Sequence, residues 1–170
     1  EQGLQRDNFG ALPRETARAA ICDELELPYD TQLIVGCGTV DFRKGVDLFV
    51  AAAMDVLERQ PSEAKPCFIW IGAGERSVIS SFVGTRVLDS GRQDQIRFIG
   101  ERRDVEPYFV AADVFLMTSR VDPFPCVCQE AMACGTPIVT FRDGGGTVEM
   151  IGDKAGYAVP NFDPSLMADR

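Results

Sequence analysis

Two carboxylates, one before a predicted helix and one inside it, are the most promising chemical groups within residues 122–141. Asp122 opens a loop with two prolines, which lack an N–H donor and fix φ, so Pro125 suits the first residue of a helix. Glu130 then lies about one turn into that helix, and a glycine and a proline end it before an apolar strand at 137–141. Carboxylates in such places bind paired hydroxyls, as an acid binds ribose in dinucleotide sites. The pattern predicts a hydroxyl-binding site, and the alternative is that Asp122 caps a turn and Glu130 is solvated.

A glycine-rich loop with two cations lies at residues 36–45, directly after an apolar run and before a predicted helix at 45–57. Glycines such as Gly38 let the backbone approach a ligand, the helix N-terminus favours an anion, and Arg43 and Lys44 add positive charge there. A diphosphate would fit. The Walker pattern is absent and the G-x-G-x-x-G fingerprint lacks its third glycine, which disfavours a dehydrogenase. A tight turn with a solvated Arg-Lys pair is the alternative interpretation.

Three further loops follow strand-like runs and are candidates for the same ligand. Residues 72–76 contain Gly74 and can bring backbone close to a ligand, or simply turn into a helix. Residues 100–104 offer backbone groups to a base or ribose, or form an exposed charged turn. Residues 143–147 lead into a short helix that Thr147 is expected to cap, with Glu149 facing the same cleft.

The elements that must position these loops alternate between strand-length apolar runs and helical stretches. This alternation predicts an α/β fold, with a parallel sheet of about six strands between two layers of helices. In such sheets ligands bind at the carboxyl ends of the strands, where the loops above would lie. A further helix is expected from about Pro13 to Leu25. The predicted strands lie at residues 31–38, 66–72, 96–100, 113–119, 137–141 and 156–159.

Composition limits the classes of function. A chain of 170 residues with 45% hydrophobic content suits one domain with a proper core, and no run reaches the length of a membrane span. Residues 1–10 show no signal-peptide pattern, so a cytoplasmic protein is expected. The net charge of −9 argues against nucleic acid as the main partner.

The cysteine and histidine content excludes other chemistry. Six cysteines are present, including Cys126, Cys128 and Cys134, but no paired C-x-x-C spacing, and the chain has no histidine. A zinc site is therefore disfavoured, and Ser-His-Asp and Cys-His nucleophile schemes are ruled out for this chain. Cys37 and Cys67 fall within strand-like runs, where a reduced cysteine acts as a small core residue.

Taken together, these loops resemble the C-terminal domain of retaining glycosyltransferases of the GT-B fold, the group 1 or family-four class. The resemblance covers nearly the whole chain, and it implies one Rossmann-like α/β/α half of that two-domain fold. The segments that carry it are VGCGTVDFRKGVDLFVAAA (35–53), FIWIGAGE (68–75), IRFIGERRDVEPYFVAADVFLMTSRVDPFPCVCQEAMACGTPIVTF (96–141) and GGGTVEMI (144–151).

The resemblance implies a site for a nucleotide-diphosphate-sugar donor, with UDP, GDP or ADP as the nucleotide and without a metal or other cofactor. Asp122 would contact hydroxyls of the transferred sugar, Glu130 the ribose, and Lys44 the phosphates. The catalytic set is then Asp122, Glu130 and Lys44. The donor-binding set is Gly38, Arg43, Lys44, Gly74, Glu101, Arg102, Asp122, Phe124, Pro125, Cys126, Val127, Cys128, Glu130 and Glu149.

Two positions depart from the family pattern, which usually has glutamate at the place of Asp122 and arginine at the place of Cys37. Arg43 is a candidate to replace that arginine. The resemblance also implies that residues 1–170 are one donor-binding domain of a larger enzyme. On this expectation, residues 1–170 would not include the N-terminal acceptor-binding domain or the C-terminal crossing helices of the family. Any peripheral membrane association would come through the absent domain, and the isolated domain should transfer little or no sugar.

Two rival functions stay open. The glycine-rich loops and acids are also compatible with a nucleotide-sugar epimerase of similar fold, or with a noncatalytic nucleotide-sugar binding module. An epimerase would need no acceptor, whereas a binding module would show no activity in the full-length protein.

Overall fold

The computed structural model describes residues 11–59, 66–74 and 77–170. Two expectations fall partly outside this range. The signal-peptide argument concerns residues 1–10, and the predicted ligand-binding loop at 72–76 includes Glu75 and Arg76. In the described residues the chain forms a six-stranded parallel sheet with strand order β3-β2-β1-β4-β5-β6. The predicted α/β fold with about six parallel strands is confirmed. The strands are β1 (Gln32–Cys37), β2 (Pro66–Ile71), β3 (Ile96–Gly100), β4 (Val114–Met117), β5 (Ile138–Phe141) and β6 (Gly156–Val159).

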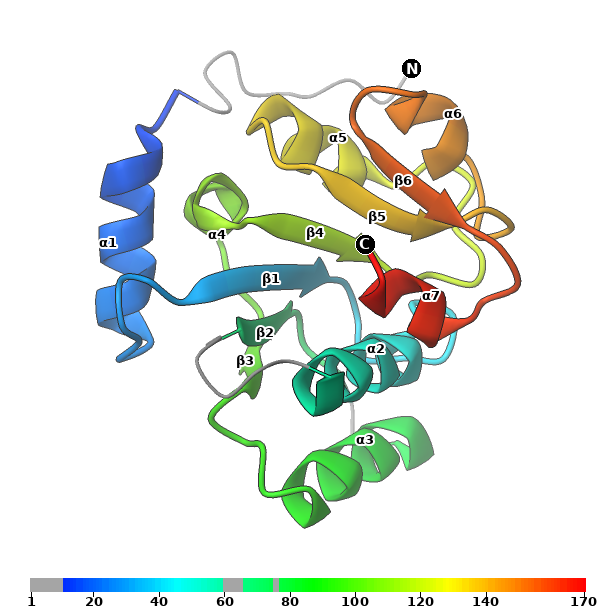
Figure 1. Ribbon diagram of the computed structural model, residues 1–170, viewed down its shortest axis with the longest axis horizontal. Coiled ribbons are helices and arrows are strands. Elements are labelled where there is room, and N and C mark those ends of the chain that lie inside the picture. Colours follow the sequence, from blue (N-terminus) through cyan, green and yellow to red (C-terminus); the bar gives the residue numbers. More distant parts are fainter. Residues whose placement is uncertain (1–10, 60–65, 75–76) are drawn as a thin grey trace.

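Helices cover both faces of the sheet, which gives three layers (Figure 1). One face carries α1 (Arg14–Glu24), α4 (Glu106–Ala111), α5 (Cys126–Ala133) and α6 (Thr147–Ile151). The other carries α2 (Val46–Arg59), α3 (Val78–Asp89) and α7 (Pro164–Ala168). The short α7 was not predicted from the sequence.

Two hydrophobic cores result because successive side chains of a strand point to opposite faces. Along β2, Ile69 packs with the α1 layer, whereas Phe68 and Trp70 pack with the α2 layer. The ring of Phe49 on α2 meets Phe68 and Trp70 edge to face, with ring centroids 6.0 and 5.1 Å apart. Such buried aromatic contacts hold α2, and the loop before it, in a fixed place over β1 and β2.

Helix starts agree with the sequence to within one or two residues, with two corrections. Pro125 is the N-cap of α5 and so precedes its first helical residue. Thr147 does not cap α6, whose N-cap is Gly146; its side chain is buried instead, with its Oγ1 3.8 Å from the Cys128 Sγ. Thr147 is thus used for packing between α5 and α6.

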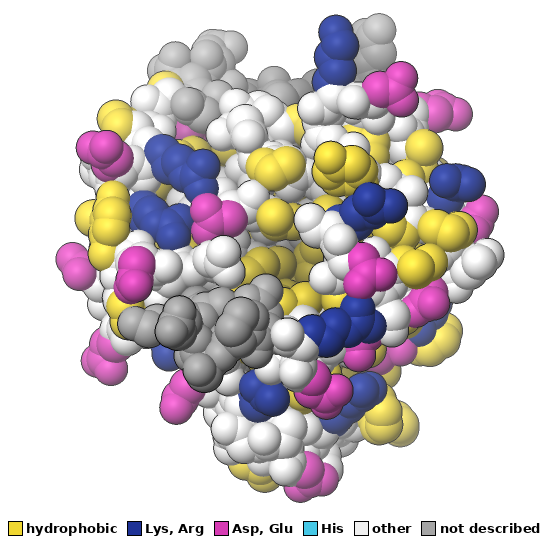
Figure 2. All heavy atoms as spheres, in the orientation of Figure 1, with side chains coloured by type: hydrophobic (Ala, Val, Ile, Leu, Met, Phe, Trp, Pro, Cys, Tyr) yellow, Lys and Arg dark blue, Asp and Glu magenta, His cyan; other side chains and the backbone are white. Residues whose placement is uncertain are grey.

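The described surface shows two further properties. Lysine and arginine side chains are interspersed with acidic ones over the face seen in Figure 2. Among the described residues, no helix is long and apolar enough to cross a membrane.

Candidate functional site

The centre of the sheet, where β1 and β4 are neighbours, is the point at which the strand order reverses direction. The connections after β1 and β4 leave toward opposite faces here, and ligands of open α/β sheets bind in the crevice that this reversal creates. The loop after β1 contains Lys44 and the loop after β4 contains Asp122. In Figure 1 both loops lie at the right-hand end of the central strands.

Hydrogen bonds to main-chain carbonyls join these two loops. The Thr118 hydroxyl donates to the Lys44 carbonyl at 3.2 Å, and the Arg120 amide donates to the Arg43 carbonyl at 2.8 Å. Gly45 has a φ of +68°, and a Cβ there would lie 1.9 Å from the Thr118 carbonyl oxygen. A glycine is therefore required at this crossing, because any side chain would force the loops apart.

Lys44 and Asp122 form an ion pair between the loops. The Lys44 Nζ lies 2.6 Å from the Asp122 Oδ2, and the two side chains are 16% and 12% exposed. The sequence placed both residues in strand-to-helix loops, and the structure brings their charges together across 78 positions of the chain. A cation and a carboxylate, both mostly withdrawn from water, thus lie side by side at the strand ends.

Asp41 organises the turn that presents Lys44. Its Oδ1 accepts a hydrogen bond from the Lys44 amide and its Oδ2 accepts one from the Thr39 hydroxyl, both at 2.6 Å. Burial tends to raise the pKa of Asp41, but these hydrogen bonds and the charges of Arg43 and Lys44 hold the pKa below its ordinary value. The Asp41 carboxylate is therefore held in its ionised form, in which it accepts both hydrogen bonds of the turn.

The glycine run 144–146 supports Asp122 from the other side. The Asp122 amide donates to the Gly144 carbonyl at 2.9 Å, and the Gly146 amide donates to the Asp122 carbonyl at 3.3 Å. Gly145 forms a parallel bridge with Asp122, and a Cβ on Gly145 would lie 2.0 Å from the Asp122 carbonyl oxygen. The run therefore serves as a backbone support for the carboxylate.

Glu130 on α5 lies near Cys37 at the end of β1, close enough for its carboxylate to influence the pKa of that thiol. Burial raises the pKa of Cys37, at the end of β1, to about 12; the Glu130 carboxylate raises it further and the Lys44 ammonium opposes the rise. Burial likewise raises the pKa of Cys128 to about 12, the Thr147 hydroxyl opposes the rise and Asp122 adds to it. Both thiols are neutral, and they pack beneath the charged residues of the site.

The start of α5 borders this cluster. Cys126 is exposed, Val127 is half-buried and Phe124 is 51% exposed, so these residues face solvent, whereas Pro125 between them is buried. Among the described side chains none caps this N-terminus. The positive end of the helix dipole is therefore directed to the outside of the cluster, where it favours an anion.

A pocket of about 460 Å³ opens beside the cluster, over the ends of β2 and β3. Gly74 lines it, whereas Gly38 packs under the aliphatic part of Lys44, with Lys44 carbons 3.1–3.3 Å from the position of a Cβ. The indole Nε1 of Trp70 on β2 donates to the Gly38 carbonyl at 3.0 Å and so joins β2 to the loop after β1. The lining residues are Val40, Gly72, Ala73, Gly74, Ser80, Val83, Gly84, Phe98 and Gly100.

Other predicted residues lie apart from the cluster or only at its edge. Arg102 turns toward α1, where its Nε donates to the Tyr108 hydroxyl at 2.9 Å and its Nη2 meets Glu24 at 3.2 Å. Glu101 and Glu149 are exposed. Arg43 is also exposed and donates to the Val121 carbonyl at 3.3 Å, so it contacts the loop after β4 at its outer edge.

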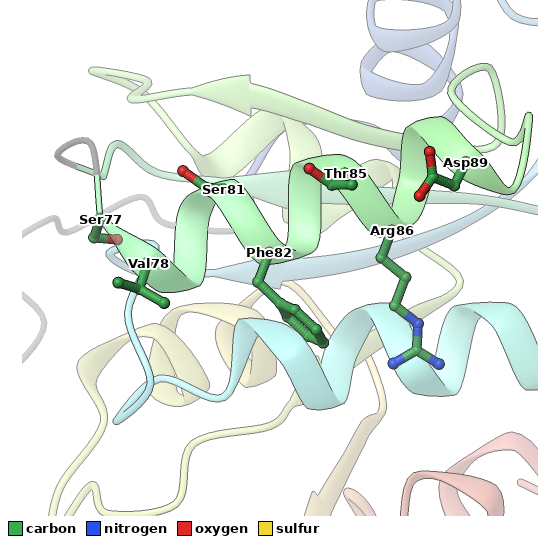
Figure 3. Close-up of a pocket in the computed structure, with 7 residues that line it drawn as sticks. All are labelled: Ser77, Val78, Ser81, Phe82, Thr85, Arg86 and Asp89. Atoms are coloured by element: carbon green, nitrogen blue, oxygen red, sulfur yellow. The ribbon is translucent and has the colours of Figure 1, made fainter.

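A larger hollow of about 930 Å³ runs along the outer side of α3, but it lacks the features of a reaction site. Its lining comes from one helix and its N-cap, and the side chains in Figure 3 project to different sides of that helix. Polar groups that converge on one point are what distinguish a binding site. The cluster at the centre of the sheet has them. The residues of the α3 hollow are Ser77, Val78, Ser81, Phe82, Thr85, Arg86 and Asp89.

Sequence reasoning missed one feature of the cluster, an ion pair between Arg120 and Asp47. The two Arg120 Nη atoms lie 2.8 and 2.7 Å from the two Asp47 oxygens. Neither Asp47 nor Arg120 was predicted to belong to the site, because opposite charges 73 positions apart carry no local signal.

Comparison with known proteins agrees with this geometry. The model of the family described as Glycosyl transferases group 1 matches residues 31–170. A D-inositol 3-phosphate glycosyltransferase of Xylanimonas cellulosilytica is 34% identical over 171 residues, covering 98% of this chain and 40% of that protein. The chain thus spans less than half the length of this relative.

Solved structures share the fold. The C-terminal domain of a glycosyl transferase group 1 family protein (LpcC) from Francisella tularensis matches with a TM-score of 0.79 and 22% identity, covering 98% of this chain and 85% of that one. Anabaena HepE, solved in complex with UDP, matches with a TM-score of 0.78 and 20% identity, covering 91% of this chain and 41% of that one. The chain belongs to the group 1 glycosyl transferases and has the Rossmann-like fold of one half of a GT-B enzyme.

Proposed function

We propose that this chain binds the nucleotide-diphosphate-sugar donor of a retaining glycosyltransferase, whose acceptor site lies on a second domain. The observation that carries the proposal is the Lys44–Asp122 pair, 2.6 Å apart at the switch point of the sheet. Around it lie the start of α5, Glu130 and the glycine-lined pocket over β2 and β3. Relatives of this chain are D-inositol 3-phosphate glycosyltransferases, and Anabaena HepE was also solved with UDP-glucose.

In this proposal the cation and the helix N-terminus stabilise the diphosphate. Negative charge grows on the diphosphate as the bond to the sugar breaks, and fixed positive groups stabilise that charge without reorganising. Lys44 supplies the ammonium and α5 supplies its dipole, so no metal is required. Glu130 accepts hydrogen bonds from the ribose, and the base occupies the pocket beside Gly74.

Asp122 has two successive roles in this scheme. Before the donor arrives it neutralises Lys44, which avoids leaving an unpaired and largely buried ammonium. When the diphosphate binds, it replaces Asp122 as the partner of the Lys44 ammonium. The Asp122 carboxylate can then accept hydrogen bonds from the sugar. Because its side chain is one methylene shorter than glutamate, it selects a sugar that approaches the loop after β4 closely.

The first test is calorimetric titration of the 170-residue chain with UDP, GDP and ADP and their glucose conjugates, with and without Mg²⁺. We expect one nucleotide series to bind, with an affinity that does not depend on Mg²⁺. Glu130→Gln should weaken it about 10- to 100-fold, since hydrogen bonds to a charged group contribute roughly 1.5–3 kcal/mol.

The control is Glu58→Gln, an exposed residue near the end of α2, which should leave the affinity unchanged. Failure of all three series to bind at millimolar concentration would contradict the donor site. Sugar transfer to an acceptor by this chain alone would contradict the assignment of the acceptor site to a second domain. Conversion of the donor sugar by the full-length protein without acceptor would favour an epimerase instead.

A further inference from the structure

Arg120, which lies between β4 and Asp122, makes its side-chain contacts with the residues that surround Lys44. Its guanidinium forms the two-pronged pair with Asp47, at 2.8 and 2.7 Å, and Nη1 also donates to the Phe42 carbonyl at 2.8 Å. The same group lies over the Phe42 ring, 3.8 Å from its centroid. Phe42 precedes Lys44 by two residues and Asp47 follows it by three, so one side chain holds the chain on both sides of the lysine.

This contact adds a side-chain restraint to the main-chain contacts and the Asp41 hydrogen bonds that already hold the loop. Gly38 and Gly45 both have positive φ, and glycines of this kind leave the free chain many conformations. A lysine side chain adds four rotatable bonds of its own. The Arg120 and Asp47 side chains are 21% and 18% exposed, so water competes only weakly for their charges. The loop is therefore fixed relative to β4 by a partly buried, two-pronged charge contact.

The chemistry of the contact requires arginine. A planar guanidinium can bind both oxygens of a carboxylate while it stacks on an aromatic ring, whereas a lysine ammonium is a point charge that does neither as well. The Arg120 amide also donates to the Arg43 carbonyl at 2.8 Å, which aligns the loop after β4 with the residue just before Lys44. Movement of Arg120 would therefore displace Lys44 from Asp122.

We propose that Arg120 is a positioning residue, which acts through Phe42 and Asp47 to hold Lys44 where it meets the donor diphosphate. This inference rests on the proposed function for the identity of the ligand, but its structural part concerns Lys44 alone. Arg120 itself does not contact the substrate in this scheme.

The structural part can be tested without any nucleotide. The chain contains three lysines, Lys44, Lys65 and Lys154, so the rate of acetylation by acetic anhydride can be followed for each by mass spectrometry. In the native chain Lys44 should react slowly, because its side chain is 16% exposed and paired. Arg120→Met should raise the Lys44 rate at least threefold relative to Lys154. Arg120→Lys should raise it nearly as much, because the two-pronged contact is lost although the charge is kept.

The matched control is Arg18→Met. Arg18 is also a largely buried arginine, 14% exposed, which contacts the Asp113 carboxylate and the Ala111 carbonyl on the α1 face of the sheet. Its loss should lower stability but leave the Lys44 rate unchanged. If Arg120→Met does not fold, Asp47→Asn removes the same contact and should give the same increase. An unchanged Lys44 rate in both Arg120→Met and Asp47→Asn would overturn the proposal.

The functional part is tested by titrating single and double variants with whichever of UDP, GDP and ADP the native chain binds. We expect Arg120→Met to weaken binding of that nucleotide about tenfold, and to have little further effect when Lys44→Met is already present, because the arginine acts through the lysine. An equal loss in both backgrounds would mean that Arg120 acts independently, and would overturn the inference. If the native chain binds none of UDP, GDP and ADP, the proposed function fails, and the acetylation rates still decide the role of Arg120.

Discussion

Replacing Lys44 by methionine should separate stability from nucleotide binding. The substitution keeps most of the side-chain volume but removes the ammonium, and so leaves the 12% exposed Asp122 carboxylate without its cation. The Asp122→Asn variant removes the carboxylate with almost no change in shape. The double variant removes both charges together.

The expected magnitude follows from the burial of the pair. Fully exposed pairs contribute about 0–1 kcal/mol, and removal of one partner of a buried pair costs about 3–5 kcal/mol. With side chains 16% and 12% exposed, the pair lies between these limits. We therefore expect Lys44→Met to lower the free energy of unfolding by about 2 kcal/mol and the melting temperature by roughly 5 °C. The double variant should recover to within about 1 kcal/mol of the native chain, because no buried charge is left unpaired.

Binding should follow a different pattern. Lys44→Met loses a charge-assisted hydrogen bond to phosphate, so its affinity for UDP should fall about 10- to 100-fold. The double variant should bind UDP with the same low affinity. UDP without a sugar is the ligand of choice, because the proposed contact of Asp122 with the sugar then plays no part. Asp122→Asn alone should bind UDP at least as well as the native chain, since the ammonium no longer has a competing partner.

Urea denaturation and calorimetry on the four proteins provide the test. If the double variant recovered UDP affinity together with stability, the weak binding of Lys44→Met would be a consequence of local unfolding. The assignment of Lys44 to the phosphates would then be wrong. The double variant also tests the ion pair itself. If its loss of stability equalled the sum of the losses in the two single variants, the ion pair would contribute nothing to stability.

Two further predictions concern the loop crossing and the buried thiols. Gly45→Ala should lower the free energy of unfolding by more than about 2 kcal/mol, because its Cβ would lie 1.9 Å from the Thr118 oxygen. Gly135→Ala, where φ is +74° but no described atom lies within 4 Å, should cost only about 1–2 kcal/mol; equal losses in urea denaturation would refute the steric argument. The raised pKa values of Cys37 and Cys128, about 12 against an ordinary 9.0, predict that stability falls as pH rises from 9 toward 12. In that range the unfolded thiols ionise and the folded ones stay protonated, so the unfolded state binds fewer protons. Denaturation at pH 8, 9 and 10 should show this fall, and the Cys37→Ala/Cys128→Ala variant should show a smaller one; the same slope in both would contradict the reasoning.

The sequence by itself determined the elements of the fold and the loops that contain the site. Each of the predicted apolar runs contains one strand of the sheet. In β2, for example, every residue is buried, and burial on both faces leaves an uninterrupted apolar stretch that can be read locally. Glycine and proline mark the connections for an equally local reason, since they restrict or extend φ at their own positions. The α5 region, from Asp122 to the strand at 137–141, was predicted almost residue by residue for this reason.

Only the tertiary structure decided which loops meet. Strand order is not a property of any segment: β1 and β4 are neighbours although β2 and β3 lie between them in the chain. That neighbourhood brings Lys44 to Asp122 across 78 positions and Arg120 to Asp47 across 73. It also left Arg102, predicted at the donor site, turned toward α1 and Glu24. Charges act over a few ångströms in space, whereas a sequence records only distance along the chain. The loops of the candidate site could therefore be named from the sequence, but the contacts between them could not.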